Sequence, residues 1–130
     1  MTLYHFCAAK HIKSILRHGL DQGGLTEIKP TGFVVHGGWT WLTTDPDPAH
    51  QSWATSNLVQ YSRTAWRLTI EIPDEEYRRL YDRIGATMLY PSCSALFRGF
   101  VGSENWRVFH GTIPKEWIKK AEEMPHGAGA

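Results

Sequence analysis

The chain has 130 residues, of which 42% are hydrophobic, and a formal net charge of +1 at pH 7. This length and composition predict one globular domain with its own core. The near-neutral charge argues against a strong general attraction to nucleic acid or to an anionic membrane, and leaves only a local basic patch open. No run approaches the roughly 20 apolar residues that cross a bilayer.

The cysteine content and the N-terminal residues indicate a cytoplasmic protein. Cys7 and Cys93 lie far apart and form no C-x-x-C pair, so we expect buried free thiols in a reducing compartment. The N-terminus lacks the basic and apolar regions of a signal peptide. We therefore expect a cytoplasmic location, in the source cell or in a host cell, and no association with a membrane.

The first part of the chain predicts a strand over residues 2–6 and a helix over residues 8–18. Apolar residues recur at helical spacing in the second segment, at Ile12, Ile15 and Leu16, and Gly19 is suited to end that helix. Residues 21–32 are expected to form a loop. Two strands follow, over 33–35 and 39–43, with a tight Gly-Gly connection between them.

Alternation of apolar and polar residues predicts the clearest strand at residues 66–72, which Pro73 ends. The remaining pattern predicts a turn at 45–48, short helices at 49–54, 74–81 and 115–123, a polar loop at 55–62, mostly irregular structure at 84–102, a strand at 106–110 and a frayed tail at 124–130. Strands and helices that do not alternate regularly favour an α+β fold, with one domain over residues 1–123.

Several common catalytic motifs are missing from the sequence. There is no G-x-G-x-x-G and no P-loop pattern, so a Rossmann or P-loop phosphate site is not supported. There is no H-E-x-x-H and no cysteine cluster, so no metal site is expected. His11 and His18 are interpreted as surface residues.

His5 and Glu104 are the candidate catalytic residues. His5 lies within an apolar strand, where it is either a core histidine bonded to a carbonyl or a donor to a ribose hydroxyl. Glu104 opens a late strand, where it is either a solvated carboxylate or a group that stabilises a sugar cation. Cleavage of an N-glycosidic bond passes through such an oxocarbenium-like state, and one carboxylate suffices when the leaving group is a neutral ring.

Other residues are candidates for framing a nucleotide. Thr43 and Thr44 end a strand, where they form either a turn or the wall of a cleft. Trp41 and Trp53 could stack on an aromatic base. Arg63 and Arg67 flank the clearest strand and either pair at the surface or hold a pyrophosphate.

The segments Leu3-Tyr4-His5-Phe6, Gly19-Leu20, the strand at 39–43 and the carboxylate-led strand at 104–109 together resemble the ADP-ribosyltransferase-like fold. The resemblance is to the branch with DNA-targeting ADP-ribosyltransferase toxins and RNA 2′-phosphotransferases. It implies a split, mostly antiparallel sheet with flanking short helices, and NAD as the substrate. No acid precedes Glu104 closely, which makes an arginine target less expected.

By this resemblance, Glu104 is the catalytic residue and His5 orients the ribose. The residues implied to frame the nucleotide are Tyr4, His5, Trp41, Thr43, Thr44, Trp53, Tyr61 and Arg67. The implied activity is that of an NAD-dependent mono-ADP-ribosyltransferase or an NAD glycohydrolase, of toxin or phage-effector type, with a protein or nucleic-acid acceptor.

Two alternatives to this activity stay open. An RNA 2′-phosphotransferase would need basic residues that converge on a phosphate, with Arg63, Arg67, Arg98 and Arg107 as candidates. A catalytically inactive relative would instead bind a nucleotide or a protein as an inhibitor.

Overall fold

The computed structural model describes residues 1–51, 62–91 and 101–125. Its centre is a six-stranded sheet in the order β6-β7-β4-β1-β5-β8, in which every described strand pair is antiparallel. The bounds are β1 Thr2–Cys7, β4 Trp39–Thr43, β5 Trp66–Glu71, β6 Leu80–Tyr81, β7 Trp106–His110 and β8 Ile118–Glu123. The expected class, an α+β domain with a mostly antiparallel sheet and short helices, is confirmed at this level.

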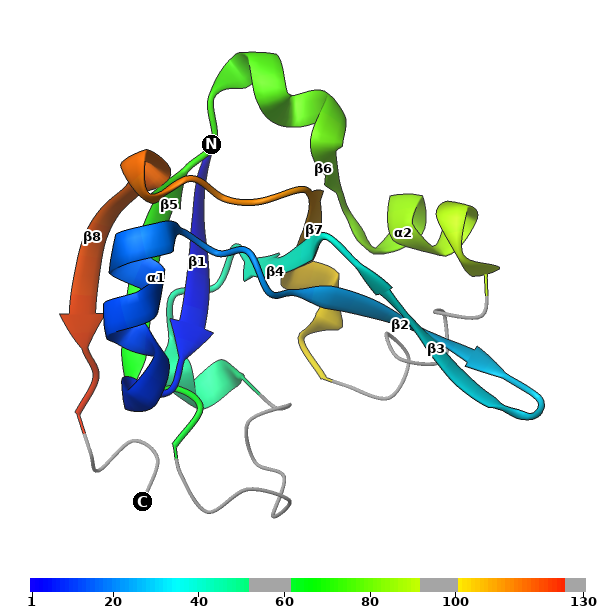
Figure 1. Ribbon diagram of the computed structural model, residues 1–130, viewed down its shortest axis with the longest axis horizontal. Coiled ribbons are helices and arrows are strands. Elements are labelled where there is room, and N and C mark those ends of the chain that lie inside the picture. Colours follow the sequence, from blue (N-terminus) through cyan, green and yellow to red (C-terminus); the bar gives the residue numbers. More distant parts are fainter. Residues whose placement is uncertain (52–61, 92–100, 126–130) are drawn as a thin grey trace.

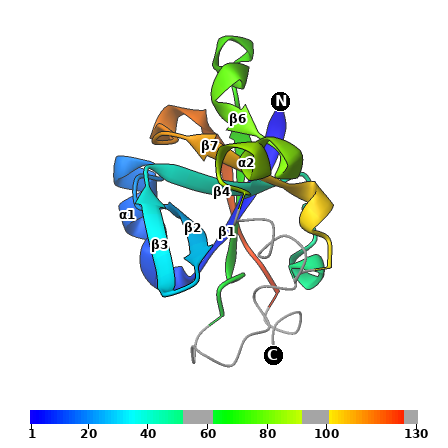
Figure 2. The ribbon, with the colours of Figure 1, turned by 90° about the vertical axis from the view of Figure 1, so that its right-hand side faces the viewer.

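A separate two-stranded hairpin and a few short helices complete the described structure. The hairpin consists of β2 Gly24–Lys29 and β3 Gly32–Gly37, and it projects from the body of the domain (Figure 1). The α-helices are α1 Ile12–His18 and α2 Arg83–Leu89, and the 3₁₀ helices are η1 Ala9–His11, η2 Pro48–His50, η4 Asp74–Arg79, η6 Ser103–Asn105 and η7 Lys115–Trp117. In Figure 2, α1 and the hairpin lie on the same side of β1.

The main core lies between α1 and the central strands. It joins Leu3 and Cys7 of β1, Leu68 and Ile70 of β5, and further buried residues from α1, β4, β7 and the segment after β7. The alternating pattern that predicted the strand at 66–72 is seen directly, because Leu68, Ile70 and Ile72 are buried. A smaller cluster joins Leu25 of β2 with residues of β4, β7 and α2.

Two expectations from the sequence were wrong. Residues 21–32 are not a loop, because residues 24–29 pair with β3 from Gly24 opposite Gly37 to Lys29 opposite Gly32. The strand at 33–35 therefore has β2 as its neighbour. Residues 118–123 are not a helix but strand β8, which pairs with β5.

Other elements differ in detail. The expected helix at 74–81 is the 3₁₀ helix η4 followed by the short strand β6, and the segment at 84–102 contains two turns of helix in α2. The helix at 8–18 begins as η1 and ends, as expected, at Gly19, which has φ 81°. Met124 at the start of the expected tail donates its backbone N–H to Ala65 O at 2.7 Å.

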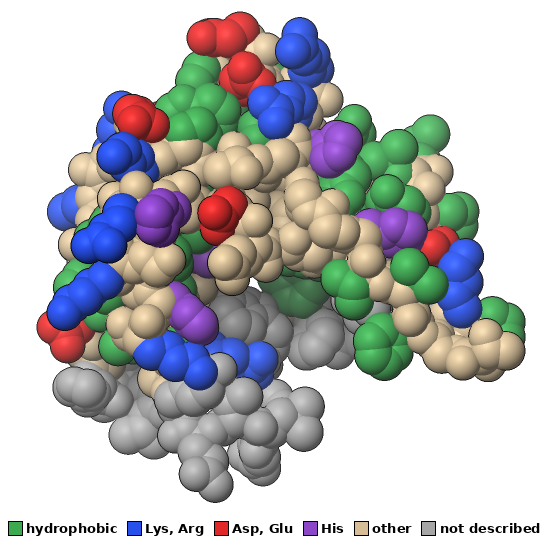
Figure 3. Space-filling model, in the orientation of Figure 1, with side chains coloured by type: hydrophobic (Ala, Val, Ile, Leu, Met, Phe, Trp, Pro, Cys, Tyr) green, Lys and Arg blue, Asp and Glu red, His purple; other side chains and the backbone are tan. Residues whose placement is uncertain are grey.

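The surface of the domain is uneven in character (Figure 3). Large exposed apolar side chains gather on the hairpin and on α2: Phe33, Val34, Val35, Ile84, Met88 and Leu89. Figure 3 shows them on the right, where Figure 1 places these two elements, whereas lysines and arginines gather on the side of α1 and β8.

Candidate functional site

The central sheet is divided between β1 and β4. Along the described strands, these two pair at one position, Tyr4 opposite Thr43, whereas β1 pairs with β5 from Thr2 to Cys7. Beyond Tyr4 the two half-sheets separate, and a pocket of about 350 Å³ lies where they diverge. Its walls come from residues 5–8 of β1 and the segment after it, Thr40 and Trp41 of β4, helix α1 and the 19–23 segment.

His5 faces this pocket from β1. Its Nδ1 atom lies 2.7 Å from the backbone oxygen of Trp41, and a carbonyl can only accept, so Nδ1 carries the hydrogen. Burial lowers the pKa of His5, which outweighs the opposite effect of the bond to Trp41. The ring is therefore neutral at pH 7, and its Nε2 atom has a free lone pair.

This tautomer changes the role expected for His5. A neutral imidazole that donates through Nδ1 accepts through Nε2. A hydroxyl group in the pocket would thus donate to His5, whereas His5 was expected to be the donor. His5 has the carbonyl hydrogen bond expected of a core histidine, and it also lines the pocket.

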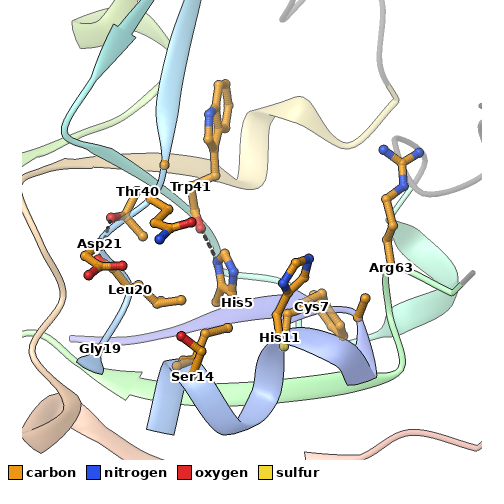
Figure 4. Close-up of a pocket in the computed structure, with 15 residues that line it drawn as sticks. His5, Cys7, His11, Ser14, Gly19, Leu20, Asp21, Thr40, Trp41 and Arg63 are labelled. Carbon is orange, nitrogen blue, oxygen red and sulfur yellow. Dashed lines mark hydrogen bonds between the residues drawn. The ribbon is translucent and has the colours of Figure 1, made fainter. Parts of the chain in front are cut away.

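Helix α1 and its flanks supply further polar groups to the pocket. His11 and Ser14 face it from the helix, Asp21 and Gln22 from the following segment, and Arg63 from the segment before β5. Figure 4 shows Asp21 and Arg63 at opposite ends with His5 between them. Helix α1 thus packs beside the pocket, and the spacing of His11 and Ser14 on one face could have identified them as lining residues.

Trp41 contributes its backbone to the site. Its carbonyl points at His5, whereas the indole lies on the other side of the strand (Figure 4). The indole N–H donates to Gly24 O at 2.8 Å, and the ring meets Trp106 edge-on with centroids 5.5 Å apart. Trp41 is thus tied to the base of the hairpin.

Tyr4 and Arg67 do not line the pocket. Neighbouring residues of a strand point to opposite faces, so Tyr4 points away from the face of His5. The Arg67 guanidinium lies 5.7 Å from the centre of the Tyr4 ring, and it donates to Glu122 Oε1 at 3.0 Å and to Pro46 O at 2.8 Å. Arg67 therefore connects β5 to β8 and to the turn after β4.

Thr43 and Thr44 serve the turn after β4. Thr43 Oγ1 accepts from the backbone N–H of Asp45 at 3.1 Å, and Thr44 Oγ1 donates to Asn105 Oδ1 at 3.1 Å. Asp45 Oδ1 accepts from the N–H of Asp47 at 2.9 Å, which forms an Asx turn within the turn predicted at 45–48. Neither threonine is among the residues that line the pocket.

Glu104 lies in η6, at the start of β7, with an exposed side chain. The backbone N–H of Thr44 donates to Asn105 O at 2.9 Å, which holds this start beside the end of β4. Glu104 is not one of the pocket residues, and the carboxylate that lines the pocket is that of Asp21. Trp53 and Tyr61 lie outside the described residues.

The four arginines proposed for a phosphate site do not gather at the pocket within the described structure. Arg63 lines it, and Arg67 is bound to Glu122. Arg107 donates to the backbone oxygens of Glu104 and Trp106, and Arg98 lies outside the described residues.

No three His, Cys, Asp or Glu side chains in residues 1–51, 62–91 and 101–125 are grouped so that they could hold a metal ion. Over the same ranges, the helices are too short and too polar for any of them to cross a bilayer. Comparison with known family models, curated proteins and solved structures finds no significant match to this chain.

Proposed function

We propose that this domain binds NAD in the pocket and cleaves the nicotinamide–ribose bond, as an ADP-ribosyltransferase or an NAD glycohydrolase. The observation that carries the proposal is the neutral His5 ring beside a pocket at the divergence of two half-sheets. Its Nε2 lone pair suits a ribose hydroxyl, which is a good hydrogen-bond donor. The first-strand histidine of the resembled family is assigned the same task.

The ends of the pocket give the ligand a direction. Arg63 provides a guanidinium suited to phosphate, and Asp21 provides a carboxylate suited to the positively charged nicotinamide ring. The volume of about 350 Å³ is near the lower end of ligand pockets, which span about 300–1,000 Å³. It suits one nucleoside half of NAD, and the other half would extend beyond the rim.

The reaction needs charge stabilisation more than covalent chemistry. The C1′–N bond breaks, its electron pair leaves with nicotinamide as a neutral ring, and a ribosyl cation forms. Water or a protein or nucleic-acid acceptor then adds to C1′ and releases a proton. A fixed carboxylate lowers the energy of the cation. By resemblance, the carboxylate that stabilises the cation is Glu104. Asp21 is the alternative candidate, because its carboxylate lines the pocket.

The experiment is calorimetric titration with NAD together with chromatography of released nicotinamide. The variants are His5→Gln, Asp21→Asn and Glu104→Gln, with the exposed Glu116→Gln as a matched control. We expect Glu104→Gln to keep NAD binding and to lose 10²-fold or more in release, about the effect of removing one preorganised electrostatic group. A wild-type protein that neither binds NAD nor releases nicotinamide, with and without a cell extract as an acceptor source, would overturn the proposal.

A nucleotide-binding domain without catalysis is the second candidate. It is supported by the exposed position of Glu104, which is not among the residues that line the pocket. Such a domain would act as an inhibitor by binding. Its signature in the same experiment is NAD binding that His5→Gln weakens, with no nicotinamide release from any variant.

A further inference from the structure

The hairpin of β2 and β3 is an arm that forms a sheet of its own. Among the described residues β3 pairs with β2 alone, and the hairpin projects away from the central sheet (Figure 1). It is attached at its base, where the Trp41 indole donates to Gly24 O and where Leu25 is fully buried. A two-stranded hairpin is at best marginally stable by itself in water, so the outer part of this arm gains from a further strand.

Strand β3 is unusually apolar for an exposed strand. Phe33, Val34 and Val35 follow one another in β3, and they are 72%, 44% and 57% exposed. Exposed edge strands are normally protected by lysine, proline or a bulge. The sequence of β3, Gly-Phe-Val-Val-His-Gly, contains neither lysine nor proline, and its register with β2 runs without a bulge from Gly32 to Gly37.

The same strand is complementary to itself. When two copies of β3 run antiparallel with Val34 opposite Val34, Phe33 of each copy faces Val35 of the other. Cross-strand pairs of an aromatic and a β-branched residue are favourable in sheets. No Asp, Glu, Lys or Arg lies in β3, so no like charges meet across the pair, and Glu27 stays with Lys29 and His36 within its own hairpin.

We propose that β3 pairs with β3 of a second copy of this chain, which joins the two hairpins into a four-stranded sheet across a twofold axis. This pairing is isologous and closes on itself. A different partner would need a free strand edge of its own, whereas a second copy already presents one with the matching apolar side chains. One strand pair is smaller than a standard interface, so we expect a dissociation constant on the order of 10–100 μM.

A cysteine at the twofold axis tests the register directly. In the Cys93→Ser background, Val34→Cys places two thiols opposite each other, at the Cα separation of about 4.5–5.5 Å that a disulfide accepts. We expect a disulfide-linked dimer on mild oxidation. Met88→Cys, 79% exposed on α2, is the matched control and should stay monomeric on the same gel.

Sedimentation of the reduced protein, from about 5 μM to 1 mM, tests association without a cross-link. Val35→Lys should abolish the concentration-dependent dimer, and Met88→Lys should leave it unchanged. Circular dichroism of both variants checks that they are folded. A wild-type protein that stays monomeric over the whole range would overturn the proposal. So would a dimer that Met88→Lys dissociates and Val35→Lys does not.

Discussion

The Nδ1 atom of His5 lies 2.7 Å from the backbone oxygen of Trp41, and this hydrogen bond joins β1 and β4 just where the two strands separate. Backbone pairing between β1 and β4 ends at Tyr4, and the side chain of His5 then supplies a further hydrogen bond between the two strands. The same bond selects the tautomer of His5 that leaves Nε2 as an acceptor. The hydrogen bond between β1 and β4 and the acceptor role proposed for Nε2 thus both depend on the proton at Nδ1 of His5.

The first prediction separates these two roles. His5→Ala removes the donor to Trp41 O and should lower the free energy of unfolding by about 1–2 kcal/mol, because a partly buried carbonyl loses its partner. His5→Gln keeps an N–H group within reach and should cost less. Urea unfolding of the three proteins measures the difference. Equal losses for Ala and Gln would show that the hydrogen bond contributes little.

The second prediction concerns acid. The pKa of His5 is lowered by burial, so the unfolded chain, with a pKa near 6.5, takes up a proton before the folded protein does. The stability that neutral His5 confers is therefore present above about pH 6.5 and is lost as the pH falls. Unfolding free energies measured between pH 7 and pH 5 should fall more for the wild type than for His5→Gln.

His50 must be kept constant in that comparison. Its hydrogen bond to Asp45 and the charges of Asp45 and Asp47 raise its pKa, so it stabilises the folded state in acid and loses this effect as the pH rises through its folded pKa. Because both proteins contain His50, its contribution cancels in the difference. If the two proteins lose stability equally, the effect assigned to His5 is absent.

The third prediction concerns the end of α1. Gly19 has φ 81° and ψ −172°, a combination that is essentially limited to glycine. A Cβ there would also overlap Ile113 O, next to the bridge in which Leu20 and Ile113 exchange hydrogen bonds of 2.9 and 3.0 Å. Gly19→Ala should therefore destabilise the protein by about 3 kcal/mol or more.

Gly37→Ala is the matched control for that substitution. A Cβ at Gly37 meets no atom within 4 Å, and its φ is not positive. We expect its midpoint in thermal unfolding to stay close to that of the wild type, with an effect within about 1 kcal/mol. Similar losses for both variants would contradict the geometric argument.

The fourth prediction concerns Cys7, which lines the pocket but should be inert. The side chain is buried, and burial raises the pKa of its thiol to about 11. The thiolate is the reactive form. In the Cys93→Ser background, a disulfide reagent at pH 8 should leave the native protein unmodified and label one thiol after unfolding. Rapid labelling of the native protein would contradict this prediction and make Cys7 a candidate nucleophile.

Local patterns determined much of the fold. The strands β1, β5 and β7 follow from apolar residues that alternate or cluster between polar ones, and Gly19 ends the first helix as its chemistry requires. Resemblance and residue type also singled out His5 as a candidate, because a lone histidine in an apolar strand needs either a hydrogen-bond partner or a function. These features depend on residues that are neighbours in the chain, so they can be predicted from the sequence.

The tertiary structure decided what depends on distant partners. Ile118 and Ala121 are three residues apart, as on a helix, yet both pack on the core from β8, because a register irregularity opposite Thr69 and Ile70 leaves Lys119 as an extra residue. Pairing with β5 thus overrides the helical propensity of a Lys- and Glu-rich segment.

The set of residues that line the pocket also depends on contacts between elements that are distant in the sequence. Tyr4 and Arg67 were grouped with His5 by resemblance, but the pleat of the sheet directs them to the other face. His11, Ser14 and Asp21 reach the pocket because α1 packs over β1. Local pattern predicted many of the elements and singled out His5 as a candidate. Which side chains meet His5 depended on how the elements pack, because each such meeting joins residues that no local pattern connects.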